Sequence, residues 1–413
     1  MGERFVLSGG LLITGKDKEV IHNPIVIING STIENVGIRG KNDFSLKDIK
    51  VINTDGCTIM PGLIDTHIHL IDDGDANVFI DIFKSSMRRC VQAVGYLKKT
   101  LLMGVTTIRS GGDGNDWFEM ALRDGIKDGI LAGPRLFATG YHLTTTGGHA
   151  YFLPPWSNMT NCVGMRCDGA DGFRKGARMQ LSYGADSVKV TLGKGLEEPD
   201  DSRIQEVTLG EAKAAVEEAH KRGKLAIGHA MGPEPIMTGI NAGINSIVHG
   251  FWLDDKCAEA MIEKNVFWEP TIRYVWKIAE EGEAENLQEF YVVKAKQAVE
   301  ALQKSFLKYY KMGVKITLGS DAGGVPLFPH GRNAEELEYM VKLGLDPIEA
   351  ICVATRNSAE CLRLKDEVGI IENGKRGDIL VVNGDVTKNI SLVTRKENIK
   401  LIMRDGNIFN NTF

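Results

Sequence analysis

Four histidines and an aspartate stand at the ends of apolar, strand-like runs. His67 and His69 lie two residues apart in DTHIHL, and side chains at i and i+2 of a strand point to the same face. His229 ends LAIGH, His249 ends NSIVH and Asp321 follows ITLGS. Imidazole nitrogens and carboxylate oxygens bind Zn²⁺ and related cations. One H-x-H pair arises readily by chance, but five such residues at strand ends predict a metal site.

Lys189 lies within the apolar run SVKVTLG. Burial disfavours an ammonium and lowers the pKa of a lysine. One interpretation is a lysine whose charged end reaches solvent at the strand end, which is the common fate of this residue. The other is a neutral amine that adds CO₂. The resulting carbamate is an anion that can bridge two divalent cations.

Strand and helix patterns alternate through the middle of the chain, where these residues lie. Residues 208–223 have a helical spacing of alanine and valine, with a capping box at Thr208 and Glu211 and a stop at Gly223. Strand-like runs occur at 59–70, 104–109, 135–140, 187–193, 225–229, 245–249, 265–271 and 314–320. Eight apolar strands separated by helices predict a parallel sheet buried on both faces. Eight such units in about 300 residues predict an α/β fold, a (β/α)₈ TIM-like barrel; an open doubly wound sheet is the alternative.

The two ends of the chain have a different pattern. Short apolar runs cut by glycine and asparagine occur near the N-terminus and again at 378–384 and 398–408, as is typical of β-hairpins. We therefore expect a small sheet domain built from residues 1–59 and 363–413. The barrel of residues 60–362 would be inserted between its two parts.

Composition narrows the classes of function. The chain has 413 residues, and 49 Lys and Arg against 54 Asp and Glu give a net charge of −5, which argues against nucleic-acid or anionic-membrane partners. The sequence has no apolar run of about 18 residues, so no membrane-spanning helix is predicted. It also has no glycine-rich nucleotide-binding motif. Seven scattered cysteines without a secretory signal pattern favour the cytoplasm. The sequence does not determine the oligomeric state, and a homo-oligomer is one of the alternatives.

The whole pattern resembles the amidohydrolase superfamily, whose members are metal-dependent hydrolases on a distorted (β/α)₈ barrel. The resemblance lies in HxH after the first strand, Lys after the fourth, His after the fifth and sixth, and Asp after the eighth. CTIMPGLIDTHIHL and GKRGDILVVNGD look like the family's junctions between the barrel and a small β-sandwich. GVTTIRSGG, GPRLFATG, TTTGGHAYF, GSDAG and PHGRNAEEL resemble the prolidase-like, imidazolonepropionase-related branch. That branch includes enzymes that cleave Xaa-Pro and Xaa-Arg dipeptides, N-acyl amino acids and ochratoxin-type amides.

The resemblance implies two divalent metal ions, most readily Zn²⁺. His67, His69 and Asp321 would bind one ion and His229 and His249 the other, with carboxylated Lys189 as the bridge. It also implies hydrolysis of amide C–N bonds by a metal-bridging hydroxide, with Asp321 as the catalytic proton shuttle. The expected substrate is a small molecule, a dipeptide or an N-acyl amino acid.

Four further residues are candidates for substrate binding. His149 lies in TTTGGHAYF and His330 in PHGRN, both in segments that match the branch. Arg273 and Tyr274 follow the seventh strand in EPTIRYVW, where an arginine could bind a carboxylate or could simply begin a solvated helix. The segment after Lys189, TLGKGLEEPDDSRIQEVT, is more charged than is usual in the branch. We expect it to set the side-chain preference.

Two other functions compete with a binuclear amide hydrolase. A mononuclear cyclic-amide hydrolase or deaminase of the imidazolonepropionase type needs no carboxylated lysine, so Lys189 argues against it. A catalytically inactive barrel that serves in assembly would be expected to lose ligands. All six candidate ligands are present, which argues against this function.

Overall fold

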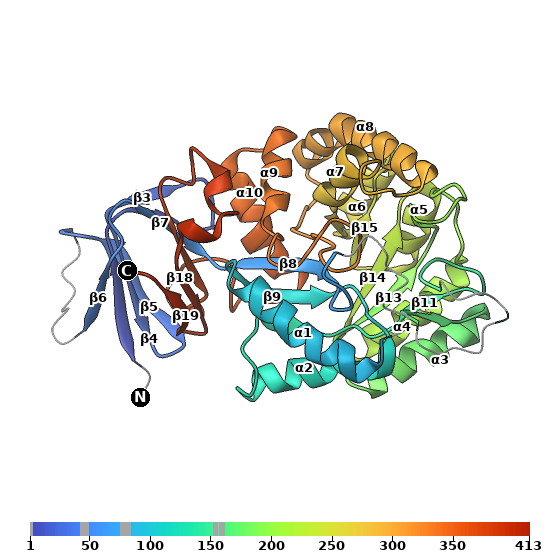
Figure 1. The fold of residues 1–413 in the computed structure, drawn as a ribbon, viewed down its shortest axis with the longest axis horizontal. Coiled ribbons are helices and arrows are strands. Elements are labelled where there is room, and N and C mark those ends of the chain that lie inside the picture. Colours follow the sequence, from blue (N-terminus) through green and yellow to red (C-terminus); the bar gives the residue numbers. More distant parts are fainter. Residues whose placement is uncertain (1–2, 42–48, 75–83, 152–155, 157–161) are drawn as a thin grey trace. The chain divides into compact units, whose positions relative to one another are not determined.

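The computed structural model describes residues 3–41, 49–74, 84–151, 156 and 162–413. The chain forms two compact units. Unit one contains Met1–Asp65, Lys98–Thr107 and Gly331–Phe413, and unit two contains Thr66–Leu97 and Ile108–His330. Figure 1 shows the order of the elements along the chain.

Unit one is built on two β-sheets. Antiparallel pairs join β1 to β4 and β4 to β5, and β1 pairs with β6 in parallel. The strand orders are β5-β4-β1-β6 and β19-β18-β17-β7-β2-β3. The strands are β1 (Arg4–Ser8), β2 (Leu11–Ile13), β3 (Val20–His22), β4 (Pro24–Asn29), β5 (Thr32–Ile38), β6 (Lys50–Asn53), β7 (Cys57–Pro61), β17 (Ile379–Asn383), β18 (Ile399–Arg404) and β19 (Asn407–Asn411).

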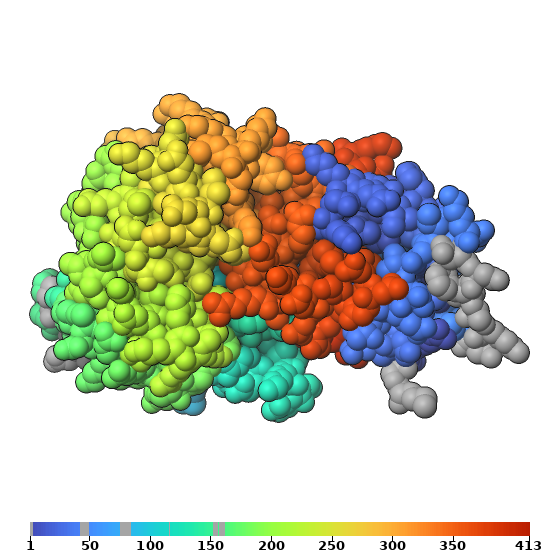
Figure 2. Space-filling model, turned by 180° about the vertical axis from the view of Figure 1, so that it is seen from behind, coloured from blue at the N-terminus to red at the C-terminus, as the bar shows by residue number. Residues whose placement is uncertain are grey.

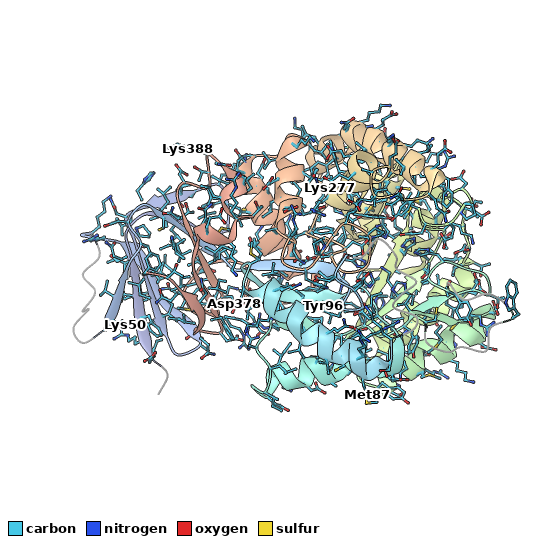
Figure 3. The ribbon with its side chains drawn as sticks, in the orientation of Figure 1. Lys50, Met87, Tyr96, Lys277, Asp378 and Lys388 are labelled. Atoms are coloured by element: carbon cyan, nitrogen blue, oxygen red, sulfur yellow. The ribbon has the colours of Figure 1, made fainter. Side chains whose placement is uncertain are left out.

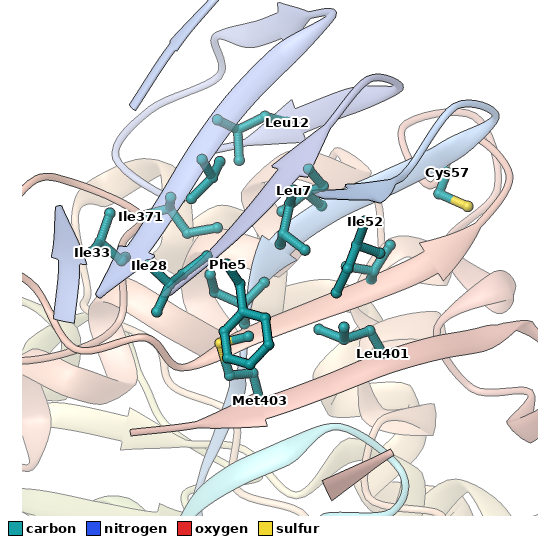
Figure 4. Close-up of a cluster of buried hydrophobic side chains, with 14 residues drawn as sticks. Phe5, Leu7, Leu12, Ile28, Ile33, Ile52, Cys57, Ile371, Leu401 and Met403 are labelled. Carbon is teal, nitrogen blue, oxygen red and sulfur yellow. The ribbon is translucent and has the colours of Figure 1, made fainter. Parts of the chain in front are cut away.

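The two sheets of unit one share a hydrophobic core (Figure 4). Phe5 and Leu7 come from β1, and they cluster with Val381 of β17 and with Leu401 and Met403 of β18. All five side chains are buried. Unit one also holds the helices α9 (Glu335–Lys342), α10 (Pro347–Cys352) and α11 (Ser358–Cys361).

Unit two has an α/β architecture with parallel strands, as the sequence predicts. Strands lie in the orders β10-β9-β8 and β12-β11-β13-β14-β15-β16, and the neighbouring strands of the second sheet pair in parallel. The strands are β8 (Leu63–Ile68), β9 (Val105–Ser110), β10 (Arg135–Phe137), β11 (His142–Thr144), β12 (Gly164–Arg166), β13 (Ser187–Thr191), β14 (Leu225–Ala230), β15 (Ser246–His249) and β16 (Phe267–Glu269). β8 and β9 begin in unit one and end in unit two.

Helices lie outside these strands (Figure 1) and follow them along the chain. They are α1 (Ser86–Leu101), α2 (Phe118–Lys127), α3 (Gly169–Ser182), α4 (Leu209–Lys221), α5 (Pro233–Ala242), α6 (Asp255–Lys264), α7 (Ile272–Glu281) and α8 (Glu289–Met312). Figure 2 shows the segments coloured green to orange as a continuous surface on one face. None of the helices in the described ranges is long and apolar enough to cross a membrane.

The predicted helix at 208–223 is confirmed as α4. The Thr208 side chain accepts from the Glu211 backbone N–H, and the Glu211 side chain bonds back to the Thr208 N–H. Gly223 follows the helix with φ +69°, a left-handed conformation that costs glycine little.

The predicted strand at 314–320 is wrong as a continuous strand. The segment has one isolated bridge, between Ile316 and Trp268, and a second bridge, between Ala322 and Ile68, follows just beyond its end. Its hydrogen bonds are divided between two neighbours: Thr317 donates to the carbonyl of Trp268, and Thr66 donates to that of Leu318. Because neither side receives a full ladder, the segment links β16 to β8 without forming a strand with either.

Candidate metal centre and active site

Four candidate ligands lie at or just beyond the carboxyl ends of their strands: His67 and His69 at the end of β8, His229 in β14 and His249 in β15. Lys189 is the middle residue of β13, and Asp321 follows the segment at 314–320, which forms no continuous strand. The register of the sheet places Thr191 opposite His229 and Ala230 opposite His249. All six side chains are buried, with His69, the most exposed of them, at 7%. Imidazole, amine and carboxylate groups therefore converge away from bulk water.

Three of the six form a compact group. Oδ1 of Asp321 lies 3.3 Å from Nε2 of His67 and 3.4 Å from Nε2 of His69. The three ligand atoms all lie within 4.8 Å of one another. Ligand atoms about 2.1 Å from a tetrahedral Zn²⁺ are themselves separated by about 3.4 Å. The group therefore has the donor types and the spacing that a divalent cation requires.

His229 and His249 form a second pair. Their ring centroids are 4.6 Å apart with an interplanar angle of 74°, and the ring of His249 lies 6.1 Å from that of His67. Nδ1 of His249 bonds to Oγ1 of Thr271 at 2.9 Å, and Nε2 of His229 lies 3.2 Å from the carbonyl oxygen of Lys194. These bonds use one nitrogen of each ring, so Nδ1 of His229 and Nε2 of His249 are the nitrogens that could bind a metal ion.

Burial sets the charge of most of these groups. Burial lowers the pKa of Lys189 from 10.5 to about 7, although Glu269 and Asp321 act in the opposite direction. It also lowers the pKa of His249 to about 3 and the pKa of His67 and His229 well below 6.5. Neutral imidazoles are the form that binds metals.

Asp321 and His69 depart from this trend. Burial would raise the pKa of Asp321, but hydrogen bonds to His67 and His69 outweigh it and hold the pKa well below 3.8. Burial would lower the pKa of His69, but hydrogen bonds to Asp113 and Asp321 raise it to about 9. In the metal-free protein His69 therefore carries the proton that a metal ion would displace.

The backbone is strained at two of the candidate ligands. His249 has φ +70° and Asp321 has φ +66°, a left-handed conformation that is uncommon for residues other than glycine. Strain of this kind persists where the surrounding structure enforces it, often at functional sites.

The chain matches the model of the Amidohydrolase family over residues 58–409. The chain belongs to the amidohydrolase family. The predicted family and the predicted enzyme class, a hydrolase of carbon–nitrogen bonds, are both confirmed.

Similar proteins in the prolidase-like branch cover nearly the whole chain. Ochratoxinase of Aspergillus niger is 27% identical over 436 aligned residues, which span 98% of this chain and 86% of that enzyme. A crystal structure of a Xaa-Pro dipeptidase with bound methionine in its active site has a TM-score of 0.88 at 30% identity, covering 99% of this chain and 100% of the other. A prolidase complexed with N-methylphosphonate-L-proline has a TM-score of 0.90 at 24% identity, with the same coverage, and this likeness shows the fold alone.

In this amidohydrolase, two buried carboxylates that sequence reasoning missed lie beside the ligands. Oδ1 of Asp113 lies 2.9 Å from Nδ1 of His69. Glu269 forms a buried ion pair with Arg109, and its Oε2 lies 3.9 Å from Nδ1 of His67. A charged residue inside an apolar run, as in GVTTIR and NVFWEP, is the sequence signal that could have identified the pair.

The charged segment after β13 packs against His149. Nδ1 of His149 lies 2.7 Å from Oε1 of Glu198, and its ring stacks on that of His229 with centroids 4.2 Å apart. Burial would lower the pKa of His149, but the charge of Glu198 raises it to about 9. Lys194 forms an ion pair with Glu206 at 2.9 Å. His149 is therefore a charged group in contact with a candidate ligand.

Tyr274 also meets this segment. Its hydroxyl donates to Oε1 of Glu197 at 3.0 Å and lies 2.8 Å from the hydroxyl of Tyr291. The neighbouring Arg273 is buried. Its Nη1 donates to the carbonyl of Leu327, and its guanidinium lies 4.0 Å from the ring centroid of Phe328.

His330 has partners on two other segments. Its Nε2 lies 3.0 Å from the carbonyl oxygen of Asp72, and its backbone N–H donates to Asp73. Its ring stacks on Tyr96 of α1, with centroids 4.7 Å apart; Tyr96 is labelled in Figure 3.

Proposed function

We propose that this chain is a binuclear metal-dependent hydrolase of amide bonds, in which carboxylated Lys189 bridges two divalent ions, most readily Zn²⁺. The observation that carries the proposal is the position of Lys189. It is only 1% exposed and lies in β13, between strands that bear histidines. A buried lysine with a pKa of about 7 is half neutral at neutral pH, and a neutral amine can add CO₂.

The donor groups divide into two sets. His67, His69 and Asp321 would hold one ion, because their ligand atoms have the spacing of a coordination sphere. His229 and His249 would hold the second through the nitrogens that their hydrogen bonds leave open. Metal ions bound in this way lower the pKa of water to about 7 and polarise a carbonyl.

Asp321 is the proposed proton shuttle. Its ionised carboxylate can accept the proton of the attacking water at Oδ2 while Oδ1 stays beside the two histidines. The same carboxyl group can then donate that proton to the leaving nitrogen, as a general base that becomes a general acid. Burial excludes competing water from this transfer.

The proposed substrate is a dipeptide or an N-acyl amino acid, with release of the C-terminal residue as in a carboxypeptidase. The similarity to ochratoxinase and to a Xaa-Pro dipeptidase supports this choice. His149 would contact the substrate, because it stacks on His229. Arg273, Tyr274 and His330 already bond to neighbouring segments, so we propose that they shape the walls of the substrate site.

We extend the proposal to architecture and location. The link that residues 314–322 make between β16 and β8 supports a closed (β/α)₈ barrel, and the shared core of unit one supports a β-sandwich. The proposed boundaries stay at 1–59 with 363–413, and 60–362. Seven scattered cysteines suit the reducing cytoplasm.

A mononuclear hydrolase of cyclic amides, or a deaminase, is the second candidate. The compact group His67, His69 and Asp321 favours it, because these three residues could bind one metal ion without help from Lys189. Elemental analysis of active protein purified with bicarbonate and without chelator separates the two. We expect two metal ions per chain, and full activity with one would favour the mononuclear enzyme.

A hydrolysis screen tests the proposed function. Zinc-loaded protein is assayed against dipeptides, N-acyl amino acids, cyclic amides and aminated purines, with release of the amine as the readout. We expect linear amides to be cleaved and His249→Ala to abolish cleavage. His22→Ala is the matched control, because His22 is an exposed histidine in β3 of unit one. Turnover of the cyclic amides or purines alone would contradict the proposal.

A further inference from the structure

The loop after β9 lies directly against the metal-binding histidines. A Cβ atom at Gly111 would be 2.5 Å from Cε1 of His67 and 2.7 Å from Nε2 of His69. These distances are too short for any side chain. The position of this loop therefore determines how much room the two imidazoles have.

Asp113, at the end of the loop, holds His69 in place. Its Oδ1 lies 2.9 Å from Nδ1 of His69, while its Oδ2 accepts from the Leu70 backbone N–H at 2.9 Å and from the Ser110 hydroxyl at 3.1 Å. Asp113 and Ser110 are completely buried. This carboxylate fixes the ring so that Nε2 faces Asp321.

Glu119, in the first turn of α2, joins this loop to the one after β10. Its Oε1 accepts from the Asp113 N–H at 2.8 Å, and its Oε2 accepts from the Thr139 N–H at 2.8 Å. The Gly140 N–H lies 3.3 Å from both oxygens. The side chain is completely buried. One carboxylate thus receives three backbone N–H groups from two loops.

Backbone hydrogen bonds reinforce the same junction. The Gly114 N–H donates to the carbonyl of Gly140 at 2.9 Å. The Thr139 hydroxyl donates to the backbone carbonyl of Ser110 at 2.5 Å. Nε2 of His142 lies 2.8 Å from the carbonyl of Gly112. Glu119 joins both loops in this network, and its bonds reach the residue that holds His69. Burial, and next the charge of Asp113, raise the pKa of its carboxyl group to about 8.

We propose that Glu119 is a positioning residue of the metal centre. By holding the Asp113 N–H against the Thr139–Gly140 turn, it keeps Asp113 on His69 and so sets the affinity of the first metal site. The inference rests on the proposed metal site but not on any particular substrate. Groups that orient a ligating histidine typically change metal affinity by about tenfold to a hundredfold when mutated.

Glu119→Gln is the informative variant because it keeps the shape of the side chain. Both oxygens of a carboxyl group can accept a hydrogen bond, whereas an amide offers one accepting oxygen and a donating NH₂ group. At this position the NH₂ group would face a backbone N–H, either that of Asp113 or that of Thr139. One bond of the junction is lost and the loop is displaced from His69.

Asp186→Asn provides the matched control. Oδ2 of Asp186 accepts from the Ala138 N–H at 3.2 Å and forms an ion pair with Arg123 at 2.8 Å. It therefore supports the same segment after β10, but through Ala138 rather than through Asp113. Both variants are expected to lower the thermal midpoint of the metal-free protein.

The test is the affinity of metal-free full-length protein for Zn²⁺, measured by competition with a chromophoric chelator in the absence of substrate. We expect Glu119→Gln to weaken zinc binding at the first metal site, that of His67, His69 and Asp321, by about tenfold to a hundredfold. Asp186→Asn should leave this affinity within about twofold of the wild type. The visible spectrum of the Co²⁺-loaded protein should change only in Glu119→Gln. Wild-type affinity in Glu119→Gln, or equal losses in both variants, would overturn the inference.

Glu119→Asp serves if the glutamine variant does not fold. It keeps the carboxyl group but shortens the side chain by one methylene, so the group cannot reach both loops. The same loss of zinc affinity is expected, and unchanged affinity would again overturn the inference. The zinc affinity is measured without substrate, so it tests the role of Glu119 even if the hydrolysis screen finds no cleaved substrate.

Discussion

Oδ1 of Asp321 lies 3.3 Å from Nε2 of His67, across the gap between β8 and the segment that follows residue 320. The backbone supports this approach, because the Asp321 N–H donates to the carbonyl of His67 at 2.8 Å. The left-handed φ of +66° at Asp321 turns the chain at that point. Main-chain geometry thus holds a carboxylate oxygen and an imidazole nitrogen at the separation expected of two ligands of one metal ion.

The first prediction concerns the bridging role of Lys189. Lys189→Ala removes the amine that would carry the carbamate, so the proposed second ion loses a ligand and activity should fall with metal content. Added acetate should restore part of both, because a small carboxylate can occupy the vacated space. Metal analysis and turnover of the same preparations check this. Unchanged metal content would return Lys189 to a purely structural role.

The second prediction is the pH dependence of reactivation. In the metal-free protein burial lowers the pKa of Lys189 from 10.5 to about 7, and only the neutral amine adds CO₂. Below about pH 7 the neutral fraction falls roughly tenfold per pH unit. At fixed dissolved CO₂ and excess Zn²⁺, the rate of activity recovery should therefore rise up to about pH 7 and then level off.

The control for this experiment is Lys189→Ala rescued by acetate. The recovery of activity in this variant involves no amine, so its rate should show no inflection near pH 7. A wild-type rate that keeps rising to pH 10 would mean that Lys189 titrates as an ordinary solvated lysine.

The positions of the candidate ligand histidines could be predicted from the sequence because strand geometry is regular. An apolar run that ends in histidine places that residue at the carboxyl edge of a parallel sheet. His67, His229 and His249 do lie in strands of unit two, and the spacing of His67 and His69 brings both beside Asp321.

The supporting residues could not be predicted in this way. Asp113 and Glu119 act through hydrogen bonds between loops, and no periodicity predicts which loop meets which. The pairing of His149 with Glu198 likewise depends on how the charged segment after β13 folds back. The segment at 314–320 has the apolar pattern of a strand, but its backbone bonds are divided between two neighbours. A pattern of residue types contains no information about that division.

The third prediction tests Asp321 as the proton shuttle. Asp321→Asn keeps the shape and one oxygen ligand but removes the basic oxygen. Loss of a general acid–base group typically lowers kcat by about 10²–10⁴-fold, so we expect a fall in this range with most of the metal retained. Turnover and elemental analysis of one preparation measure both. Near-normal kcat at neutral pH would exclude Asp321 as the base.

The last prediction concerns the space between the β9 loop and the metal ligands. Gly111→Ala introduces a Cβ atom at 2.5 Å from Cε1 of His67 and 2.7 Å from Nε2 of His69. One imidazole must move, and the compact donor group opens. We expect the zinc affinity to fall by at least about tenfold, as for other changes that misorient a ligand.

Gly95→Ala is the matched control for this change. Gly95 lies within α1, where a Cβ atom would have no heavy atom within 4 Å apart from its chain neighbours and the backbone of its own helix. Alanine is favoured over glycine inside a helix by about 0.5–1 kcal/mol, so this variant should be slightly more stable with unchanged zinc affinity. Chelator competition and thermal unfolding of both variants separate the two effects. If Gly111→Ala bound zinc as tightly as the wild type, the loop would have room to retreat, and its contact with the histidines would not govern the metal site.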